Sequence, residues 1–175
     1  LLAKLELGSG GFADIRFQEL SSVSLQFQNG LAKEVTSTIV GGVAIRALVQ
    51  GAWGFSSVAE VSKKTLEEGL KSAVAMAKNA SEKVKTPRKI CDEYVNEGTA
   101  KLKFDVDPRD ISLEEKIQFT QNFEKSIREV DEKIARSAAN YIETINSETI
   151  LSSYGTDVYT ESGVFRLSGV ATSRE

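Results

Sequence analysis

The residues best suited to bind a cation lie in an acidic stretch near the middle of the chain. Asp105, Asp107 and Asp110 have part of the spacing of a calcium-binding loop. Such a loop also needs a glycine at its sixth position and, at its twelfth, a glutamate that binds the ion through both carboxylate oxygens. Asp110 occupies the glycine position, and Lys116 stands where the glutamate would be. We therefore interpret the aspartates as an acidic approach to a following helix, whose N-terminal dipole they complement.

The second chemical candidate is Cys91, the single cysteine in a chain of 175 residues that has no histidine. A nucleophilic cysteine needs a cationic neighbour that stabilises its thiolate, whereas Asp92 and Glu93 follow Cys91. One cysteine cannot form an internal disulfide, and the lack of histidine removes the commonest general base and the commonest zinc ligand. The sequence therefore predicts no catalytic residue, no cofactor-binding residue and no metal ligand in this chain.

Two further motifs have simpler explanations. Gly8, Gly10 and Gly11 invite comparison with a phosphate-binding loop, but such loops lead from a strand into a helix, whose terminal amides face the phosphate. Here the glycines follow a short helical stretch and precede a predicted strand. The tripeptide at residues 79–81 matches an N-glycosylation acceptor, yet nothing else in the chain indicates secretion. We interpret both motifs as structural or coincidental.

Alternating side chains predict the sheet of the first half. Over residues 13–28 the apolar side chains lie mostly at odd positions, the pattern of a half-buried strand. Because strands usually have about three to ten residues, we expect a break in the polar patch 19–22. Asn29-Gly30 predicts a hairpin turn, and Gly41-Gly42 and Gln50-Gly51 predict two more. The expected sheet is an antiparallel meander of four or five strands.

Two long helices are predicted from serine and glutamate residues with capping-box spacing. Ser57 and Glu60 place the start of the first helix, whose apolar stripe over residues 58–77 should lie on the sheet. Ser112 and Glu115 place the start of the second. Its predicted buried face consists of Leu113, Ile117, Phe123, Ile127, Val130 and Ile134.

Strand periodicity returns in the last third of the chain. We expect strands at 135–145 and 148–154, a turn at Asn146-Ser147, and one or two strands within 158–171. The predicted fold class is α+β: an antiparallel meander sheet covered by a long helix, followed by a second helix plus antiparallel strands. The predicted domains are an N-terminal α+β unit (1–80), an extended connector (81–111) and a second helix-plus-hairpin unit (112–175). The chain begins without methionine and ends inside an apparent strand, so we expect a fragment truncated at its C-terminus.

Composition and charge restrict the partners. The net charge of −3 and the pI near 5.3 are atypical of a nucleic-acid-binding surface. No apolar run approaches the roughly 18 residues of a membrane span. We expect no nucleic-acid contact, no membrane segment and a cytoplasmic location. Arg16 and Arg46 are the charged side chains most embedded in predicted strands, and their simpler interpretation is that they are solvated or ion-paired.

Several segments of the chain resemble the TldD/PmbA family of metallopeptidases, the modulator of DNA gyrase family. In the first half they are Ala13-Asp14-Ile15-Arg16-Phe17, Gln28-Asn29-Gly30, Gly42-Val43-Ala44-Ile45-Arg46-Ala47-Leu48, Trp53-Gly54-Phe55-Ser56-Ser57 and Ala75-Met76-Ala77-Lys78. In the second half they are Ser112-Leu113-Glu114-Glu115-Lys116-Ile117, the strand at 140–145 and Asn146-Ser147-Glu148-Thr149-Ile150-Leu151. The resemblance covers the N-terminal and central regions of the family.

The resemblance implies an enzyme whose chemistry lies elsewhere. Family members of the TldD kind bind zinc through a helical His-Glu-x-x-x-His motif and a later cysteine, both downstream of the region matched here. A chain without histidine cannot supply that motif, and Cys91 lies in the connector, so it is not carried over as a ligand. The resemblance thus implies zinc in the full-length protein and an inactive stretch here. Its role would be to wall the cavity for an unfolded peptide or protein substrate and to make subunit contacts in a homo- or heterodimer.

Two alternatives remain open. The chain could belong to a non-catalytic PmbA-type partner subunit, or it could be a free-standing sheet-based interaction domain. A continuation with the His-Glu-x-x-x-His motif, a continuation without it, or a stop codon would separate the three possibilities. Because an unfolded peptide can add to an exposed sheet edge through main-chain hydrogen bonds, we also expect an edge strand to line the peptide path.

Overall fold

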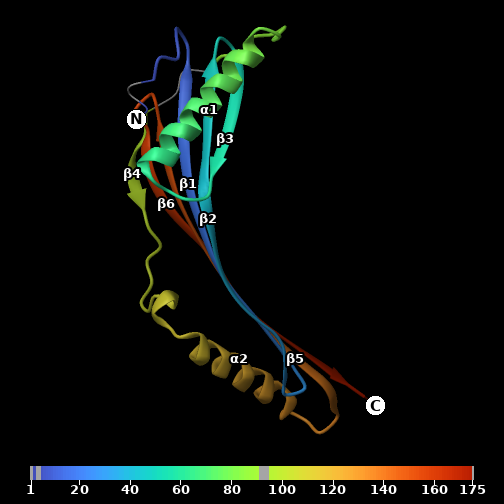
Figure 1. Ribbon diagram of the computed structural model, residues 1–175. Helices are drawn as coiled ribbons and strands as arrows, with labels where there is room; N and C mark the ends of the chain where they lie inside the picture. The colour runs from blue at the N-terminus through green and yellow to red at the C-terminus, as the bar shows by residue number, and fades with distance from the viewer. Residues whose placement is uncertain (1, 3–4, 91–94, 175) are drawn as a thin grey trace. The chain divides into compact units, whose positions relative to one another are not determined.

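The computed structural model describes residues 2, 5–90 and 95–174, which form one six-stranded sheet and two α-helices (Figure 1). The strands are β1 (Phe12–Gln28), β2 (Leu31–Val49), β3 (Ala52–Val58), β4 (Glu97–Ala100), β5 (Ile134–Ser152) and β6 (Asp157–Ser173), and the helices are α1 (Lys63–Ser81) and α2 (Leu113–Arg128). The strand order is β3-β2-β1-β5-β6-β4. Pairing is mostly antiparallel, although β4 runs parallel to β6. The predicted α+β fold class is confirmed.

The strands are longer than predicted. β1 runs without interruption from Phe12 to Gln28, so the expected break at 19–22 is wrong. The polar patch remains in the strand because its side chains find solvent or polar partners: Glu19 is exposed, and the Ser22 hydroxyl lies 3.0 Å from the hydroxyl of Thr144 on β5. Polar residues therefore do not end this strand.

β2 also continues through its predicted turn at Gly41-Gly42. A Cβ atom at Gly41 would lie 3.0 Å from the carbonyl oxygen of Gln18, so this glycine permits a close approach of the β1 backbone. The turns at Asn29-Gly30 and Gln50-Gly51 are confirmed, and all four residues have positive φ.

β5 passes straight through the turn predicted at residues 146–147, and the chain reverses instead between β5 and β6. Gly155 in this connection has a φ of 104°, a value that glycine adopts without steric cost. β6 is a single strand, and its residues 157–160 pair with β4. The predicted connector therefore contains a short strand that sequence periodicity did not reveal.

α1 covers the sheet as predicted but begins later than expected. Ser57 lies in β3 opposite Ala44, and the helix is capped by Ser62, whose hydroxyl oxygen accepts a hydrogen bond from the Thr65 N–H at 3.1 Å. The buried side of α1 packs on odd-numbered residues of β1 and β2. At Gly54 of β3 a Cβ atom would lie 2.0 Å from the Ala73 carbonyl oxygen, so helix and strand are in backbone contact there.

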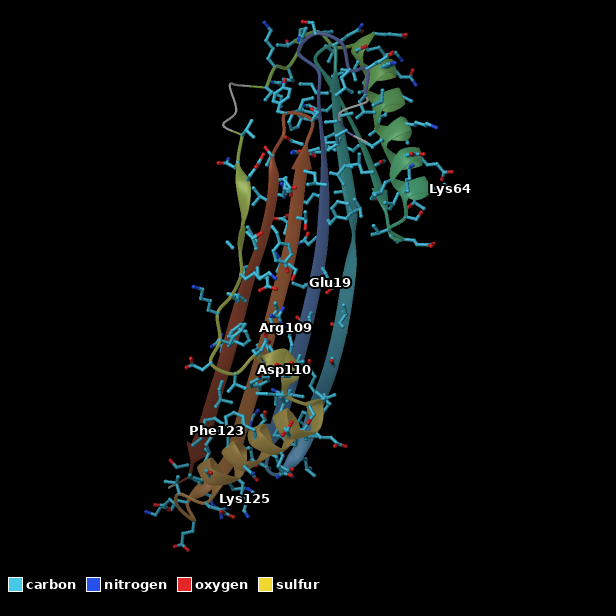
Figure 2. All side chains as sticks on the ribbon, turned by 90° about the vertical axis from the view of Figure 1, so that its left-hand side faces the viewer. Glu19, Lys64, Arg109, Asp110, Phe123 and Lys125 are labelled. Carbon is cyan, nitrogen blue, oxygen red and sulfur yellow. The ribbon has the colours of Figure 1, made fainter. Side chains whose placement is uncertain are left out.

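α2 begins at the predicted cap, Ser112. The Ser112 hydroxyl and the Ser112 N–H both donate hydrogen bonds to the Glu115 carboxylate, which lower the pKa of that carboxyl. The buried face of α2 differs from the prediction, because Lys116, Thr120 and Glu124 are the buried residues. Of the predicted apolar face, Ile117, Phe123 and Ile127 are half-buried, Leu113 and Val130 are exposed, and Ile134 lies in β5. Figure 2 shows Arg109 and Asp110 in the short 3₁₀ helix (Pro108–Asp110) that precedes α2.

The chain divides into two compact units whose segments interleave. Unit 1 comprises Leu1–Glu19, Gly41–Lys101 and Ser147–Glu161, and unit 2 comprises Leu20–Val40, Leu102–Asn146 and Ser162–Glu175. The domain boundaries drawn at residues 80 and 112 stay a prediction. Among the described residues, no helix is long and apolar enough to cross a membrane.

Candidate functional site

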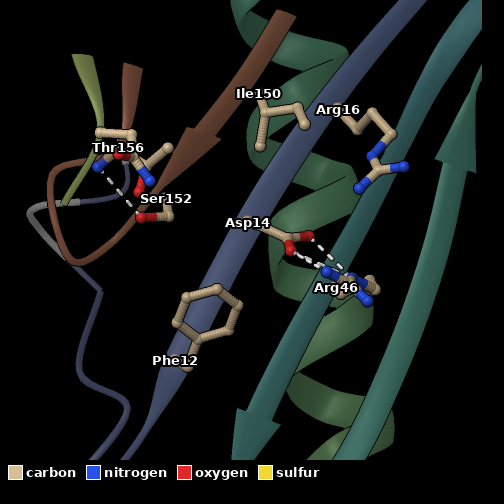
Figure 3. Close-up of a pocket in the computed structure, with 8 residues that line it drawn as sticks. Phe12, Asp14, Arg16, Arg46, Ile150, Ser152 and Thr156 are labelled. Carbon is tan, nitrogen blue, oxygen red and sulfur yellow. Dashed lines mark hydrogen bonds and ion pairs between the residues drawn. The ribbon is translucent and has the colours of Figure 1, made fainter. Parts of the chain in front are cut away.

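The candidate site lies in unit 1, on the face of the sheet turned away from α1. Ala13 and Ile15 of β1 belong to the core beneath α1. Because neighbouring residues of a strand point to opposite faces, Phe12, Asp14 and Arg16 point to the other side, as Figure 3 shows. This side of the sheet carries Arg16 and Arg46, the two charged side chains that were predicted to lie within strands.

Asp14 is a carboxylate buried near the start of β1, with 5% of its surface exposed. The Nε atom of Arg46 on β2 donates to both of its carboxylate oxygens at 3.0 Å, and a second guanidinium nitrogen also contacts one of them (Figure 3). The side chain of Arg46 is 42% exposed. The Arg46 guanidinium, which reaches the surface, therefore neutralises the buried Asp14 carboxylate. Such a partner is needed because burying an unpaired charge is energetically costly.

Arg16 forms a looser pair on the same face. Its guanidinium lies 3.3 Å from a carboxylate oxygen of Glu148 on β5, and the two side chains are 44% and 20% exposed. The interpretation of Arg16 and Arg46 as ion-paired strand residues is confirmed.

Aromatic side chains extend the site around Arg46. The Arg46 guanidinium carbon lies 5.3 Å from the centre of the Trp53 ring, within the range of a cation–π contact. The Phe12 ring meets the Trp53 and Tyr154 rings edge to face, with centroid distances of 6.1 and 5.2 Å. These contacts form a packed aromatic border on the face of unit 1 that is turned away from α1.

A cavity of about 370 Å³ opens on this face. It is lined by Phe12, Asp14, Arg16, Arg46, Asn96, Ile150, Ser152 and Thr156. The Ser152 hydroxyl oxygen accepts hydrogen bonds from the N–H groups of Tyr154 and Thr156 at 3.3 and 3.2 Å. The wall thus combines two guanidinium groups, one carboxylate, hydroxyl groups and a small apolar surface.

A second polar cluster lies in unit 2, beneath α2. The Lys116 amino group lies 2.9 and 2.8 Å from the two carboxylate oxygens of Glu143, and the Tyr141 hydroxyl donates to Glu143 at 2.5 Å. Burial, together with the Glu143 carboxylate, raises the pKa of the Tyr141 hydroxyl above its ordinary value. Lys116 and Glu143 are nearly inaccessible to solvent, so the cluster joins α2 to β5.

The other sequence candidates have structural roles. Asp107 caps the 3₁₀ helix and accepts hydrogen bonds from the backbone and side chain of Arg109, which lower the pKa of the Asp107 carboxyl. Gly8 and Gly10 form a turn before β1 with φ values of 76° and 71°. Residue Ser81 of the glycosylation motif is in the last turn of α1 and donates to the Lys78 carbonyl oxygen. Cys91 lies outside the described residues.

Sequence analysis missed Asp14 and Glu148 as partners of the two arginines. The hairpin turn at Asn29-Gly30 gives only part of this signal, because counting from it places Asp14 opposite Ile45 and Arg46 on the other face of the sheet. The structure has Asp14 and Arg46 on the same face, and the change of register that brings them together is not visible in the sequence. The contact with Glu148 has no comparable signal, since it depends on pairing between strands far apart in the sequence.

Comparison with protein families agrees with this architecture. Residues 13–80 match the model described as PmbA/TldA metallopeptidase domain 1. Residues 106–175 match the PmbA/TldA metallopeptidase central domain, so the two models together account for most of the chain. The chain belongs to the TldD/PmbA family. Both models describe the family as metallopeptidases.

Individual relatives are consistent with this family assignment. A protein named as a metalloprotease from Methanocaldococcus jannaschii is 29% identical over 165 residues, which are 90% of this chain and 35% of that protein. A solved structure described as a modulator of DNA gyrase from Bacteroides thetaiotaomicron superposes with a TM-score of 0.72 at 21% identity, over 93% of this chain and 37% of that one. TldE from Thermococcus kodakarensis gives a TM-score of 0.62 at 16% identity, over 93% and 40%. The structural matches show a shared fold.

These alignments also show that the chain spans little more than a third of the length of each relative. The residues of this part do not fit the zinc site that the family implies. The sequence has no histidine, and among the described residues no three His, Cys, Asp or Glu side chains come close enough to hold a metal ion. No catalytic step is therefore assigned to this chain.

Proposed function

We propose that this chain is the N-terminal and central part of a TldD-like zinc metallopeptidase, in which it walls the cavity for the peptide substrate and makes subunit contacts. The zinc and the catalytic residues would lie outside this chain. The substrate would be an unfolded peptide or protein, and the assembly a homo- or heterodimer with a family member.

The observation that carries this proposal is the match to two successive metallopeptidase domains, in the same order along one chain. A free-standing interaction domain would not require that order. The relative named as a metalloprotease aligns over 90% of the chain and therefore spans both domains.

The sheet offers a specific place for an extended peptide. β3 pairs with residues 43–49 of β2, so among the described strands none pairs with the outer edge of β2 at residues 31–40. All ten of these residues are exposed, and Leu31, Val35 and Ile39 share one face. Unpaired edges with apolar side chains attract another strand. We therefore assign the peptide-lining role to this edge.

Proline substitutions in the full-length protein test the assignment. The N–H groups of a strand point alternately to its two neighbours, so one of Ser37→Pro and Thr38→Pro removes an outward N–H and the other breaks the β1–β2 ladder. The outward variant should fold normally, because proline is tolerated on a sheet edge. It should lower kcat/KM for an unfolded peptide by roughly tenfold, the equivalent of one lost hydrogen bond.

Ser57→Pro is the matched control on the edge of β3. The Phe55 N–H donates to the Met76 sulfur and therefore does not pair with β2. Because every second residue of a strand points its N–H to the same side, the Ser57 N–H also lies outside the β2–β3 ladder. The control should fold and keep its kcat/KM. Urea unfolding identifies which variants have retained their structure, and an outward β2 variant that cleaves peptide as fast as the parent would refute the edge assignment.

A further inference from the structure

We propose that the cavity of unit 1 binds the carboxylate group of a peptide through Arg16. The ligand chemistry is a carboxylate with a small apolar body, as found in an acidic side chain or at a C-terminal residue. The carboxylate follows from the cavity wall, whereas the choice of a peptide as its carrier rests on the proposed function.

The two arginines of the cavity wall differ in how firmly their charges are balanced. Arg16, Arg46 and Asp14 are its charged lining residues. Asp14 is neutralised by Arg46 through both carboxylate oxygens, and that pair is anchored by the burial of Asp14. The second guanidinium of the wall, that of Arg16, is balanced only by the looser contact with Glu148, which is not a lining residue of the cavity.

The contact between Arg16 and Glu148 is weak enough for a ligand carboxylate to compete with it. Glu148 contacts a single guanidinium nitrogen at 3.3 Å, and both side chains are partly exposed. Exposed pairs of this kind contribute about 0 to 1 kcal/mol. A guanidinium has five N–H donors in a planar fork that matches a carboxylate, so a ligand carboxylate can bind beside Glu148 or displace it.

The remaining wall fits the rest of such a ligand. Phe12 and Ile150 supply apolar surface. The Ser152 oxygen accepts two backbone N–H groups, which leaves the hydroxyl hydrogen for a ligand oxygen. A volume of about 370 Å³ lies at the small end of the range for ligand pockets. It accommodates one or two amino-acid residues and excludes a folded partner.

Blocked single amino acids are suitable probes, because they contain no peptide bond between residues that a peptidase could cleave during the titration. N-acetyl-leucine carries a C-terminal carboxylate, N-acetyl-leucine amide is its neutral match, and N-acetyl-glutamic acid α-amide carries only a side-chain carboxylate. Calorimetric titration of the full-length protein should show that at least one acid binds ten times more tightly than the neutral amide. The tighter of the two acids identifies the C-terminal or the side-chain source.

Two variants give opposite expectations. Arg16→Gln should weaken acid binding about tenfold. Glu148→Gln should strengthen it severalfold, because it removes the carboxylate that competes for Arg16. A purely structural Arg16–Glu148 pair would not produce this gain, and the Glu148→Gln result stands even if Arg16→Gln fails to fold. Arg136→Gln, at an exposed arginine of β5 in unit 2, should bind like the parent.

Equal binding of acids and amide, or a Glu148→Gln variant that binds the acids no better than the parent, would overturn the inference. Peptide cleavage by the same preparations separates this result from the proposed function. Normal cleavage without acid binding rejects the carboxylate site alone. Acid binding by a full-length protein that cleaves no peptide rejects the proposed function alone.

Discussion

At the scale of single residues, the pair formed by Asp14 and Arg46 is asymmetric. The carboxylate is 6% exposed as a side chain, whereas the guanidinium is 42% exposed and also lies over Trp53. Removing the cation leaves a charge buried without its partner, whereas removing the anion leaves a cation that water can reach.

Arg46→Gln should therefore lower the free energy of unfolding by about 3 kcal/mol, and Asp14→Asn by about 1 kcal/mol. Urea unfolding at pH 7 measures both changes. Arg16→Gln is the matched control, because its pair is more exposed, and it should cost less than about 1 kcal/mol. If Asp14→Asn proved as destabilising as Arg46→Gln, the buried carboxylate would not be the reason for the pair.

At the scale of elements, α2 is attached to its sheet through polar contacts. Glu124 is inaccessible to solvent, accepts a hydrogen bond from the Gly30 N–H at 3.1 Å, and is contacted by the Ser137 hydroxyl. One helix residue thus binds the turn between β1 and β2 and the beginning of β5. Buried polar groups that are fully paired define the position of an element more narrowly than apolar contacts do.

Glu124→Ala should therefore destabilise the protein by about 3 kcal/mol, since it leaves the Gly30 N–H and the Ser137 hydroxyl without their acceptor. Glu114→Ala, at an exposed glutamate in the first turn of the same helix, should change stability by less than about 1 kcal/mol. Equal effects of the two substitutions in urea unfolding would show that α2 does not depend on this contact.

Sequence periodicity predicted both helices, the turn at Asn29-Gly30 and the apolar side of β1, because these features depend on neighbours along the chain. It failed at Gly41, where the reason for glycine is the nearby carbonyl oxygen of Gln18. It failed again at Lys116, which is buried because Glu143 and Tyr141 accompany it. In both cases the deciding partner lies in a different element of the fold, so no local pattern could show it.

At the scale of the whole molecule, each compact unit takes residues from the beginning, the middle and the end of the chain. β1, β2, β5 and β6 each contribute to both units. Within unit 1, the Ala13 carbonyl oxygen accepts a hydrogen bond from the Ser153 N–H at 2.8 Å. The candidate site therefore exists only when distant parts of the sequence have paired.

In the function proposed above, this chain supports a metallopeptidase whose zinc is bound by residues outside it. The most direct test of this proposal is the zinc content of the full-length protein and of its Cys91→Ser variant, measured together with peptide cleavage. We predict about one zinc ion per chain in both, with cleavage retained by the variant. Loss of zinc from the variant would place a ligand in this chain, and a zinc-free full-length protein that cleaves no peptide would contradict the account as a whole.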